Sequence, residues 1–360
     1  MSNGLHTPGS QVTAEMAEQP EVLARLVGRR DQVHADVRAV LPERLRGICL
    51  IARGSSDNVA VHARYLLELA TGMAVSMVAP SLITRYRRVP DLRDHLVIAL
   101  SQSGRTPEIV DVATQSVAAG GIVVAVTNDA DSPLATVSAV TLAVGTSEEL
   151  AVPATKTVTG QLALVTLLAE ATCPAGTDID HFTGGSSAWA ALAQSVCDTL
   201  VDTDPLRSAV DILAARRDGI HLARGLTYAA ALEGALKAKE TTRRGNEGYS
   251  SADFLHGPIT VASPDVAVVA YGADGPVLTD VVDTVRAAVE LGSPVIGVGH
   301  PAVADGIDGA VWVPTPQNLG EALSVIPMVV RGQQLAVDTT LALGMNPDAP
   351  HGLNKVTATH

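Results

Sequence analysis

The chain repeats itself once, with a period of about 171 residues, and this repeat constrains the fold more than any other feature. The apolar run 47–54, which ends in Arg-Gly, returns as 219–225 with the same ending. Three more pairs of short apolar runs follow in the same order, at 96–100 and 267–271, 123–126 and 295–298, and 140–144 and 311–314. We therefore expect two similar halves, each built around four such runs.

Each run is rich in Val, Ile, Leu or Ala and is bounded by Gly, Asp, Ser or Pro, which is typical of a strand buried on both faces. Helical stretches separate the runs, for example at 59–69, 106–119 and 279–291. The alternation predicts right-handed crossovers and an α/β fold with one doubly wound parallel sheet in each half. Because aromatic residues make up only 2% of the chain, aliphatic side chains must form both cores.

The repeat also suggests where the domains begin and end. We expect an N-terminal helical segment at 1–35, a first domain at 36–180, a second domain at 200–345 and a C-terminal tail at 346–360. The segment 172–187 is rich in Pro, Gly and Ser, so it is predicted to connect the domains.

Composition excludes several classes of protein. A net charge of −13 argues against a nucleic-acid partner, because binding to phosphate backbones needs clustered Lys and Arg. Three widely spaced cysteines do not predict a disulfide framework or a metal site. The sequence has no secretory h-region and no apolar run long enough to span a bilayer, so we expect a cytoplasmic protein with no membrane partner.

The loops that follow the strands are the first place to look for a ligand site, since ligands of parallel sheets bind at the carboxyl ends of strands. Ser101, Gln102, Ser103 and Thr106 lie in such a loop, directly before a helix, and Ser55 and Ser56 follow the preceding strand run. Hydroxyls and backbone N–H groups at a helix N-terminus suit a phosphate, although ordinary turn and cap chemistry uses the same residues. The matching loop 272–276 contains Asp-Gly-Pro, which repels anions, so we predict one phosphate site per chain, in the first half.

A second polar cluster lies on the predicted helix 229–240. Glu233, Lys237 and Glu240 are spaced to share one face of this small, apolar helix. They can form a solvated stripe of ion pairs, or they can transfer protons at a carbon next to a carbonyl. His256, sixteen residues further on, is a candidate for the same site.

These residues resemble a known family. The segment 231–240, followed by His256-Gly-Pro, is similar to the isomerase half of glucosamine-6-phosphate synthase, whose members have tandem flavodoxin-like sugar-isomerase (SIS) domains. The resemblance extends from Glu18 to Thr357. It implies a phosphorylated amino sugar as ligand, no cofactor, and phosphate contacts from Ser56, Ser101, Gln102, Ser103 and Thr106.

The resemblance also implies roles for the other candidates. Val152 and Thr155 would line the sugar, and we add Ser55 and Glu233 to this group. Glu240 would move a proton between C1 and C2, with Lys237 beside it. His256 would assist ring opening from the neighbouring subunit of a homodimer, and Lys355 in the catalytic tail would approach the C2 carbonyl.

The chain departs from the synthase pattern at several points. Arg53 replaces a usual cysteine and Ala154 a usual serine, and the start at Met1 leaves no room for a glutaminase domain, so we expect no glutamine hydrolysis. The ending 353–359 is similar to stand-alone glucosamine-6-phosphate deaminases. We therefore expect conversion of glucosamine 6-phosphate to fructose 6-phosphate and ammonia, with a fructosamine-6-phosphate deglycase, a galactosamine-6-phosphate deaminase/isomerase or a non-catalytic sugar-phosphate-binding regulator as alternatives.

Overall fold

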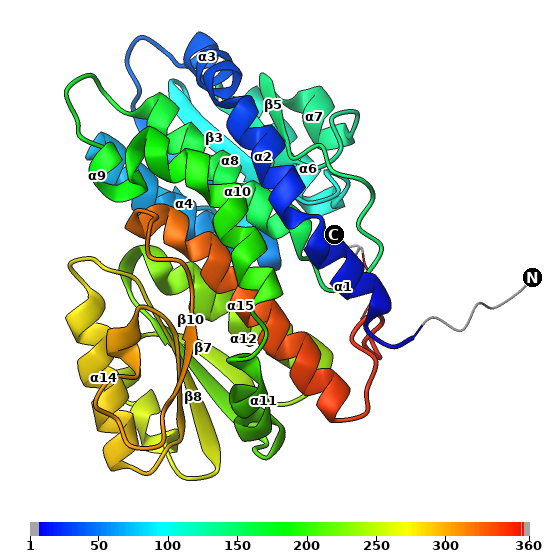
Figure 1. Ribbon diagram of the computed structural model, residues 1–360. Coiled ribbons are helices and arrows are strands. Elements are labelled where there is room, and N and C mark those ends of the chain that lie inside the picture. Colours follow the sequence, from blue (N-terminus) through cyan, green and yellow to red (C-terminus); the bar gives the residue numbers. More distant parts are fainter. Residues whose placement is uncertain (1–6, 354, 356–360) are drawn as a thin grey trace, which may run out of the picture. The chain divides into compact units, whose positions relative to one another are not determined.

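The computed structural model describes residues 7–353 and residue 355 (Figure 1). The chain divides into two compact units, each with one parallel sheet. Among the described residues, unit A comprises 21–149 and 156–181, and unit B comprises 7–20, 150–155, 182–353 and 355. The short segment 150–155 thus belongs to unit B, although the chain on both sides of it belongs to unit A.

Sheet A, in unit A, has five parallel strands in the order β2-β1-β3-β4-β5. The strands are β1 (Gly47–Ile51), β2 (Val75–Met77), β3 (His95–Leu100), β4 (Ile122–Thr127) and β5 (Val140–Ala143). In the centre of the sheet, Leu96 pairs with Ile48 on one side and with Ile122 on the other. The four predicted runs are all strands, and β2 is an additional edge strand that the repeat did not predict.

Helices cover both faces of sheet A. Odd-numbered side chains of the central strands, such as Val97 and Val123, pack against Ile83, Ile109 and Leu134. These three residues belong to α5 (Pro80–Thr84), α6 (Pro107–Ala118) and α7 (Pro133–Val137). The other helices that contact the strands of this sheet or one another are α3 (Arg30–Val40), α4 (Ser55–Thr71) and α8 (Lys156–Thr172).

Sheet B, in unit B, has the order β10-β9-β8-β6-β7, which is the order of sheet A when the strands of each half are counted from its start. The strands are β6 (Asp218–Ala223), β7 (Asn246–Ser250), β8 (Val266–Gly272), β9 (Val295–Gly299) and β10 (Val311–Pro314). Two parallel five-stranded sheets with flanking helices confirm the predicted α/β fold of two tandem doubly wound domains of the flavodoxin-like type.

The helices of unit B form two groups. Phe254 and Val285 pack into a core with strand residues such as Val268, and they belong to α13 (Ser251–Leu255) and α14 (Leu278–Glu290). A second group consists of α10 (Gly185–Val201), α11 (Leu206–Ala214), α12 (Tyr228–Thr242) and α15 (Glu321–Ala342), with α15 in contact with the other three. Short 3-10 turns occur at η1 (Gly225–Thr227), η2 (Pro258–Val261) and η3 (Pro301–Val303).

Three helices remain. α1 (Ser10–Ala17) belongs to unit B, where Val12 and Met16 pack with Val337 of α15. α2 (Gln19–Gly28) contains the division between the two units, and α9 (Asp180–Thr183) lies within the segment predicted to connect the domains.

Two glycines allow α12 to approach sheet B and α15 closely. A Cβ atom on Gly234 would lie 2.2 Å from the hydroxyl of Tyr271, and one on Gly332 would lie 3.3 Å from the Cα of Gly234. Tyr271 and His221 Nδ1 are 3.1 Å apart and hydrogen-bonded. Burial lowers the pKa of His221 to about 4 and raises the pKa of Tyr271 above its usual value. This tight contact fixes α12, the helix that carries the predicted acid–base cluster.

Candidate functional site

The predicted phosphate loop connects β3 to α6 in unit A. Ser101 is buried, and its hydroxyl accepts a hydrogen bond from the N–H of Gly104 at 3.2 Å. The hydroxyl of Ser103 accepts one from the N–H of Arg105 at 3.2 Å, and Thr106 Oγ1 lies 3.5 Å from Ser101 Oγ. Gly104 has a φ of 62°, and a Cβ there would lie 2.2 Å from the hydroxyl of Ser132, so the turn requires glycine.

The loop ends at an uncapped helix N-terminus. Thr106 is the N-cap residue of α6 but its side chain makes no capping hydrogen bond, and Pro107 occupies the first turn. Thr106 therefore supplies no side-chain acceptor to the first N–H groups of the helix, as a capping residue usually does. An anion such as a phosphate can take that place.

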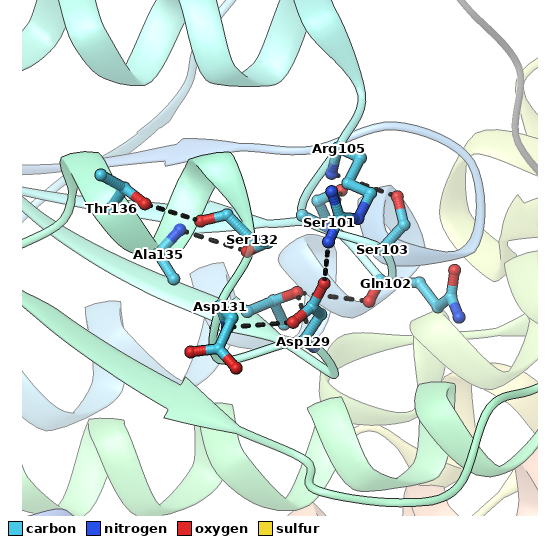
Figure 2. Close-up of polar contacts among 11 residues, drawn as sticks. Ser101, Gln102, Ser103, Arg105, Asp129, Asp131, Ser132, Ala135 and Thr136 are labelled. Carbon is cyan, nitrogen blue, oxygen red and sulfur yellow. Dashed lines mark hydrogen bonds and ion pairs between the residues drawn. The ribbon is translucent and has the colours of Figure 1, made fainter.

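The neighbouring loop after β4 holds the phosphate loop in shape. Figure 2 shows Arg105 reaching the carboxylate of Asp129, and their closest atoms are 2.7 Å apart. The carbonyl of Gln102 accepts hydrogen bonds from the N–H of Asn128 at 3.0 Å and from the hydroxyl of Thr127 at 3.3 Å. A hydrogen bond from the N–H of Asp131, together with Arg105, holds the pKa of Asp129 below its usual value. The two loops therefore form one cross-linked surface at the carboxyl edge of sheet A.

Ser55 and Ser56 begin α4 at the same edge. Ser56 is buried and donates a hydrogen bond to Gln161 Oε1 of α8 at 3.0 Å, while Ser55 is half-buried. Arg53, directly before this turn, forms an ion pair of 3.0 Å with Glu108 in the first turn of α6. The structure thus brings Arg53 to the helix that follows the phosphate loop.

Sheet B presents an acidic surface at the corresponding edge. Asp274 follows β8, and Glu321 begins α15. A Cβ on Gly275 would lie 2.6 Å from Glu321 Oε2, which brings the carboxylate against this loop. Burial and the nearby charge of Asp274 raise the pKa of Glu321 to about 7. These carboxylates are unfavourable for an anion.

The acid–base cluster of α12 is compact and mostly buried. Lys237 Nζ lies 2.6 Å from Glu240 Oε2 and 3.4 Å from Glu233 Oε1. Glu233 and Lys237 are buried, whereas the side chain of Glu240 is 22% exposed. The structure therefore places all three on one face of the helix, with Glu240 at the accessible end.

Lys355 lies against the loop that contains Val152 and Thr155. Its ammonium donates a hydrogen bond to the carbonyl of Ala151 at 2.7 Å. Thr155 is buried, and its carbonyl accepts a hydrogen bond from Gln333 at 3.3 Å. The remainder of the predicted tail, at 354 and 356–360, lies outside the described residues.

Two acidic residues that the sequence did not point to hold this loop, one through its carboxylate and the other through its backbone carbonyl. Glu15 of α1 accepts hydrogen bonds from the N–H groups of Leu150 and Ala151, and Asp348 accepts from Gly9 and Val12. The carbonyl of Asp348 also accepts from the N–H of Val152 at 2.9 Å. Glu15 lies on the apolar face of the amphipathic helix α1. A charged residue at such a position is the feature of the sequence that could have pointed to this contact.

His256 stands apart from this cluster. It is exposed at the end of α13, and its imidazole makes no hydrogen bond or ion pair within 7–353 and 355. No contact joins it to Glu240 among the interactions of these residues.

In the described part of the chain, no group of three or more His, Cys, Asp or Glu side chains is arranged to hold a metal ion. The helices in that part are also too short or too polar to cross a membrane.

The chain is similar to known proteins in sequence and in fold. Residues 45–171 match the family described as the SIS domain. A glutamine–fructose-6-phosphate aminotransferase (isomerizing) from Symbiobacterium thermophilum is 31% identical over 95% of this chain and 58% of its own length. The chain spans somewhat more than half of the length of the curated relatives it matches, for example 56% of the one from Pyrococcus horikoshii.

Solved structures extend the likeness over nearly the whole chain. The C-terminal domain of glucosamine-fructose-6-phosphate aminotransferase from Francisella tularensis has a TM-score of 0.84 and 22% identity, covering 97% of this chain and 100% of that one, which establishes the fold. A protein from Silicibacter pomeroyi DSS-3 proposed to be a phosphosugar isomerase has a TM-score of 0.78 and 29% identity, covering 94% and 99%. The chain thus contains a SIS domain at residues 45–171, and its resemblance to the isomerase domain of glucosamine-6-phosphate synthase is confirmed.

Proposed function

We propose that the protein is an amino-sugar phosphate deaminase/isomerase that converts glucosamine 6-phosphate to fructose 6-phosphate and ammonia. The observation that carries the proposal is the cluster on α12, in which a buried Lys237 holds the accessible carboxylate of Glu240 at 2.6 Å. A carboxylate fixed in this way suits proton transfer at a carbon next to a carbonyl. The resemblance of the C-terminal tail to stand-alone deaminases favours release of ammonia over its incorporation.

Phosphate binding is assigned to Ser56, Ser101, Gln102, Ser103 and Thr106. The uncapped N-terminus of α6 and the hydroxyls before it supply donors for a dianion. Ser55, Val152, Thr155 and Glu233 are assigned to the sugar. Holding the phosphate fixes the opposite end of the open-chain sugar for reaction.

The proposed reaction moves one proton and exchanges one nitrogen for oxygen. The open-chain substrate has an aldehyde at C1 and an amine at C2. Glu240 removes the C2 proton to form an enaminol and returns it to C1, which leaves an imine at C2. Water adds to this imine and ammonia departs, giving the ketose. Lys237 keeps Glu240 oriented, and Lys355 acts near C2.

His256 is proposed to assist ring opening across the interface of a homodimer. Its exposed position at the end of α13 leaves the imidazole available to another subunit. We further propose a cytoplasmic enzyme without cofactor, in keeping with three free cysteines.

An ammonia-release assay tests the proposal. Glucosamine 6-phosphate, galactosamine 6-phosphate and fructosamine 6-phosphates are compared, with glucosamine as the control without phosphate. We expect turnover of glucosamine 6-phosphate and none of glucosamine. Preferred turnover of a fructosamine 6-phosphate identifies a deglycase. Preferred turnover of galactosamine 6-phosphate identifies a galactosamine-6-phosphate deaminase/isomerase. Tight binding without turnover of any compound identifies a regulator and refutes the enzyme.

A further inference from the structure

Unit B contains a groove that none of the proposed chemistry uses. It has a volume of about 350 Å³ and is formed by side chains of α1, α10 and α15, of Pro20 at the start of α2 and of Thr203 after α10. Much of its lining is aliphatic, including Met16, Pro20, Leu200 and Val337. The volume lies within the range of small-molecule sites.

Among the described residues that line this groove, Asp338 has the one charged side chain. It is half-buried, and it makes no hydrogen bond or ion pair with any residue that the structure describes. Burial raises the pKa of its carboxyl group. A carboxylate enclosed among aliphatic side chains is most readily stabilised by a cation that also carries a hydrocarbon group.

We propose that this groove binds a small amphipathic amine, with its ammonium group on Asp338 and its hydrocarbon chain along Met16, Leu200 and Val337. The carboxylate of Asp338 would repel an anionic ligand, and a neutral alcohol would leave the charge of Asp338 uncompensated. A chain of about six carbons fits within the groove, whose volume is about 350 Å³.

The groove shares α1 with the loop assigned to the sugar. Met16 lines the groove, and the preceding residue, Glu15, accepts hydrogen bonds from Leu150 and Ala151. An amine that packs against α1 therefore stabilises the position of Glu15 as well. We infer that occupancy of the groove slows opening of the backbone at Leu150 and Ala151.

Calorimetric titration of the full chain tests the site. The probes are n-hexylammonium, n-hexanol and hexanoate, which share one hydrocarbon chain and differ in charge. We expect hexylammonium to bind with one equivalent per chain and about tenfold more tightly than hexanol, with no binding of hexanoate. Equal affinity for the amine and the alcohol would overturn the role of Asp338.

Variants separate the groove from nonspecific binding. Asp338→Asn should weaken hexylammonium about tenfold and leave hexanol unchanged. Ala17→Trp, at an exposed position of the lining, should abolish binding of both, whereas the charge-matched surface variant Asp305→Asn should change neither. Binding that persists in Ala17→Trp refutes the location. If light scattering shows instead that Ala17→Trp alters the oligomeric state and wild type binds no amine, a second copy of the chain covers the groove and the proposal is wrong.

Hydrogen exchange tests the coupling without any assay of turnover. Hexylammonium should slow exchange of the Leu150 and Ala151 amides severalfold in wild type but not in Glu15→Gln, whose neutral side chain holds these amides more weakly. Unchanged exchange in wild type at saturating amine refutes the coupling and leaves the binding site to be judged by the titrations.

Discussion

Lys237 Nζ lies 2.6 Å from Glu240 Oε2 and 3.4 Å from Glu233 Oε1, so one ammonium group joins two carboxylates on a single face of α12. Two of the three groups are buried and Glu240 is partly accessible. Burying a lysine and a glutamate together is costly unless each compensates the other. The arrangement therefore indicates that the position of Glu240 matters more than the small stability that such a pair provides.

Glu240→Gln should abolish isomerisation and leave binding of a sugar-phosphate inhibitor nearly unchanged, because the shape is kept and only proton acceptance is lost. Exchange of solvent deuterium into C1 of fructose 6-phosphate, followed by NMR, measures the step directly. Glu247→Gln is the matched control, since Glu247 is exposed and pairs with Lys239 at 2.9 Å. Persistent exchange in Glu240→Gln would remove this residue from the proton shuttle.

Ser103→Ala combined with Thr106→Ala should raise KM at least about tenfold and lower kcat much less, because the phosphate is held equally in the ground state and the transition state. Steady-state kinetics with glucosamine 6-phosphate provides both constants. Thr114→Ala, at an exposed position of α6, is the control. An unaltered KM in the double variant would locate the phosphate elsewhere.

Mixing inactive His256→Ala chains with inactive Glu240→Gln chains should restore activity if His256 acts in a neighbouring subunit. One of the two sites in each hybrid dimer then contains both intact groups, so about a quarter of wild-type activity is expected from a random equimolar mixture. Native mass spectrometry verifies subunit exchange. A mixture that exchanges subunits but stays inactive contradicts the shared site.

Deletion of residues 354–360 should reduce ammonia release by about two orders of magnitude or more and leave thermal unfolding nearly unchanged, because almost no core is removed. Both quantities are measured on the same sample. Lys355→Met removes only the ammonium group, which donates to the carbonyl of Ala151, and so distinguishes its effect from that of the rest of the tail. Normal turnover in the truncated chain would show that the tail takes no part in the reaction.

The free energy of unfolding should depend on pH through His221. Its pKa is about 4 in the folded protein, against about 6.5 in an unfolded chain. The unfolded state therefore takes up a proton first as the pH falls, so the contribution is complete above pH ~6.5 and declines toward pH ~4, by about 3 kcal/mol. Urea unfolding from pH 7 to pH 4 should show a smaller decline in His221→Asn than in wild type. The exposed His351→Gln should follow wild type, and an identical decline in all three would contradict this explanation.

The sequence predicted eight of the ten strands in the described residues, because buried parallel strands leave continuous aliphatic runs. It missed β2 and β7, which lie at sheet edges. β7 contains Asn246, Glu247 and Gly248, so it has no apolar pattern and is defined by its pairing with β6. β5 and β10 also lie at sheet edges, but their aliphatic runs made them predictable, whereas an edge strand without such a run is passed over by pattern analysis.

The sequence predicted the residues of the candidate site that lie on one helix, but not the contacts between distant parts of the chain. Helical spacing alone placed Glu233, Lys237 and Glu240 on one face. The attachment of Lys355 to Ala151, and of Glu15 to the same loop, depends on contacts between residues more than 100 positions apart, which no local pattern specifies. The Arg105–Asp129 pair was missed for the same reason, since it joins loops after different strands.

The shared strand order of the two sheets also bears on the ancestry of the chain. One ancestral unit copied in tandem accounts for both the period and the topology. In a chain with two copies, a mutation that removes anion binding from one copy leaves the other copy able to bind. Asp274 and Glu321, at the corresponding edge of sheet B, are residues that such redundancy would permit there. Two copies can specialise in this way, and our proposal assigns the anion-binding loop to the first and the acid–base residues of α12 to the second.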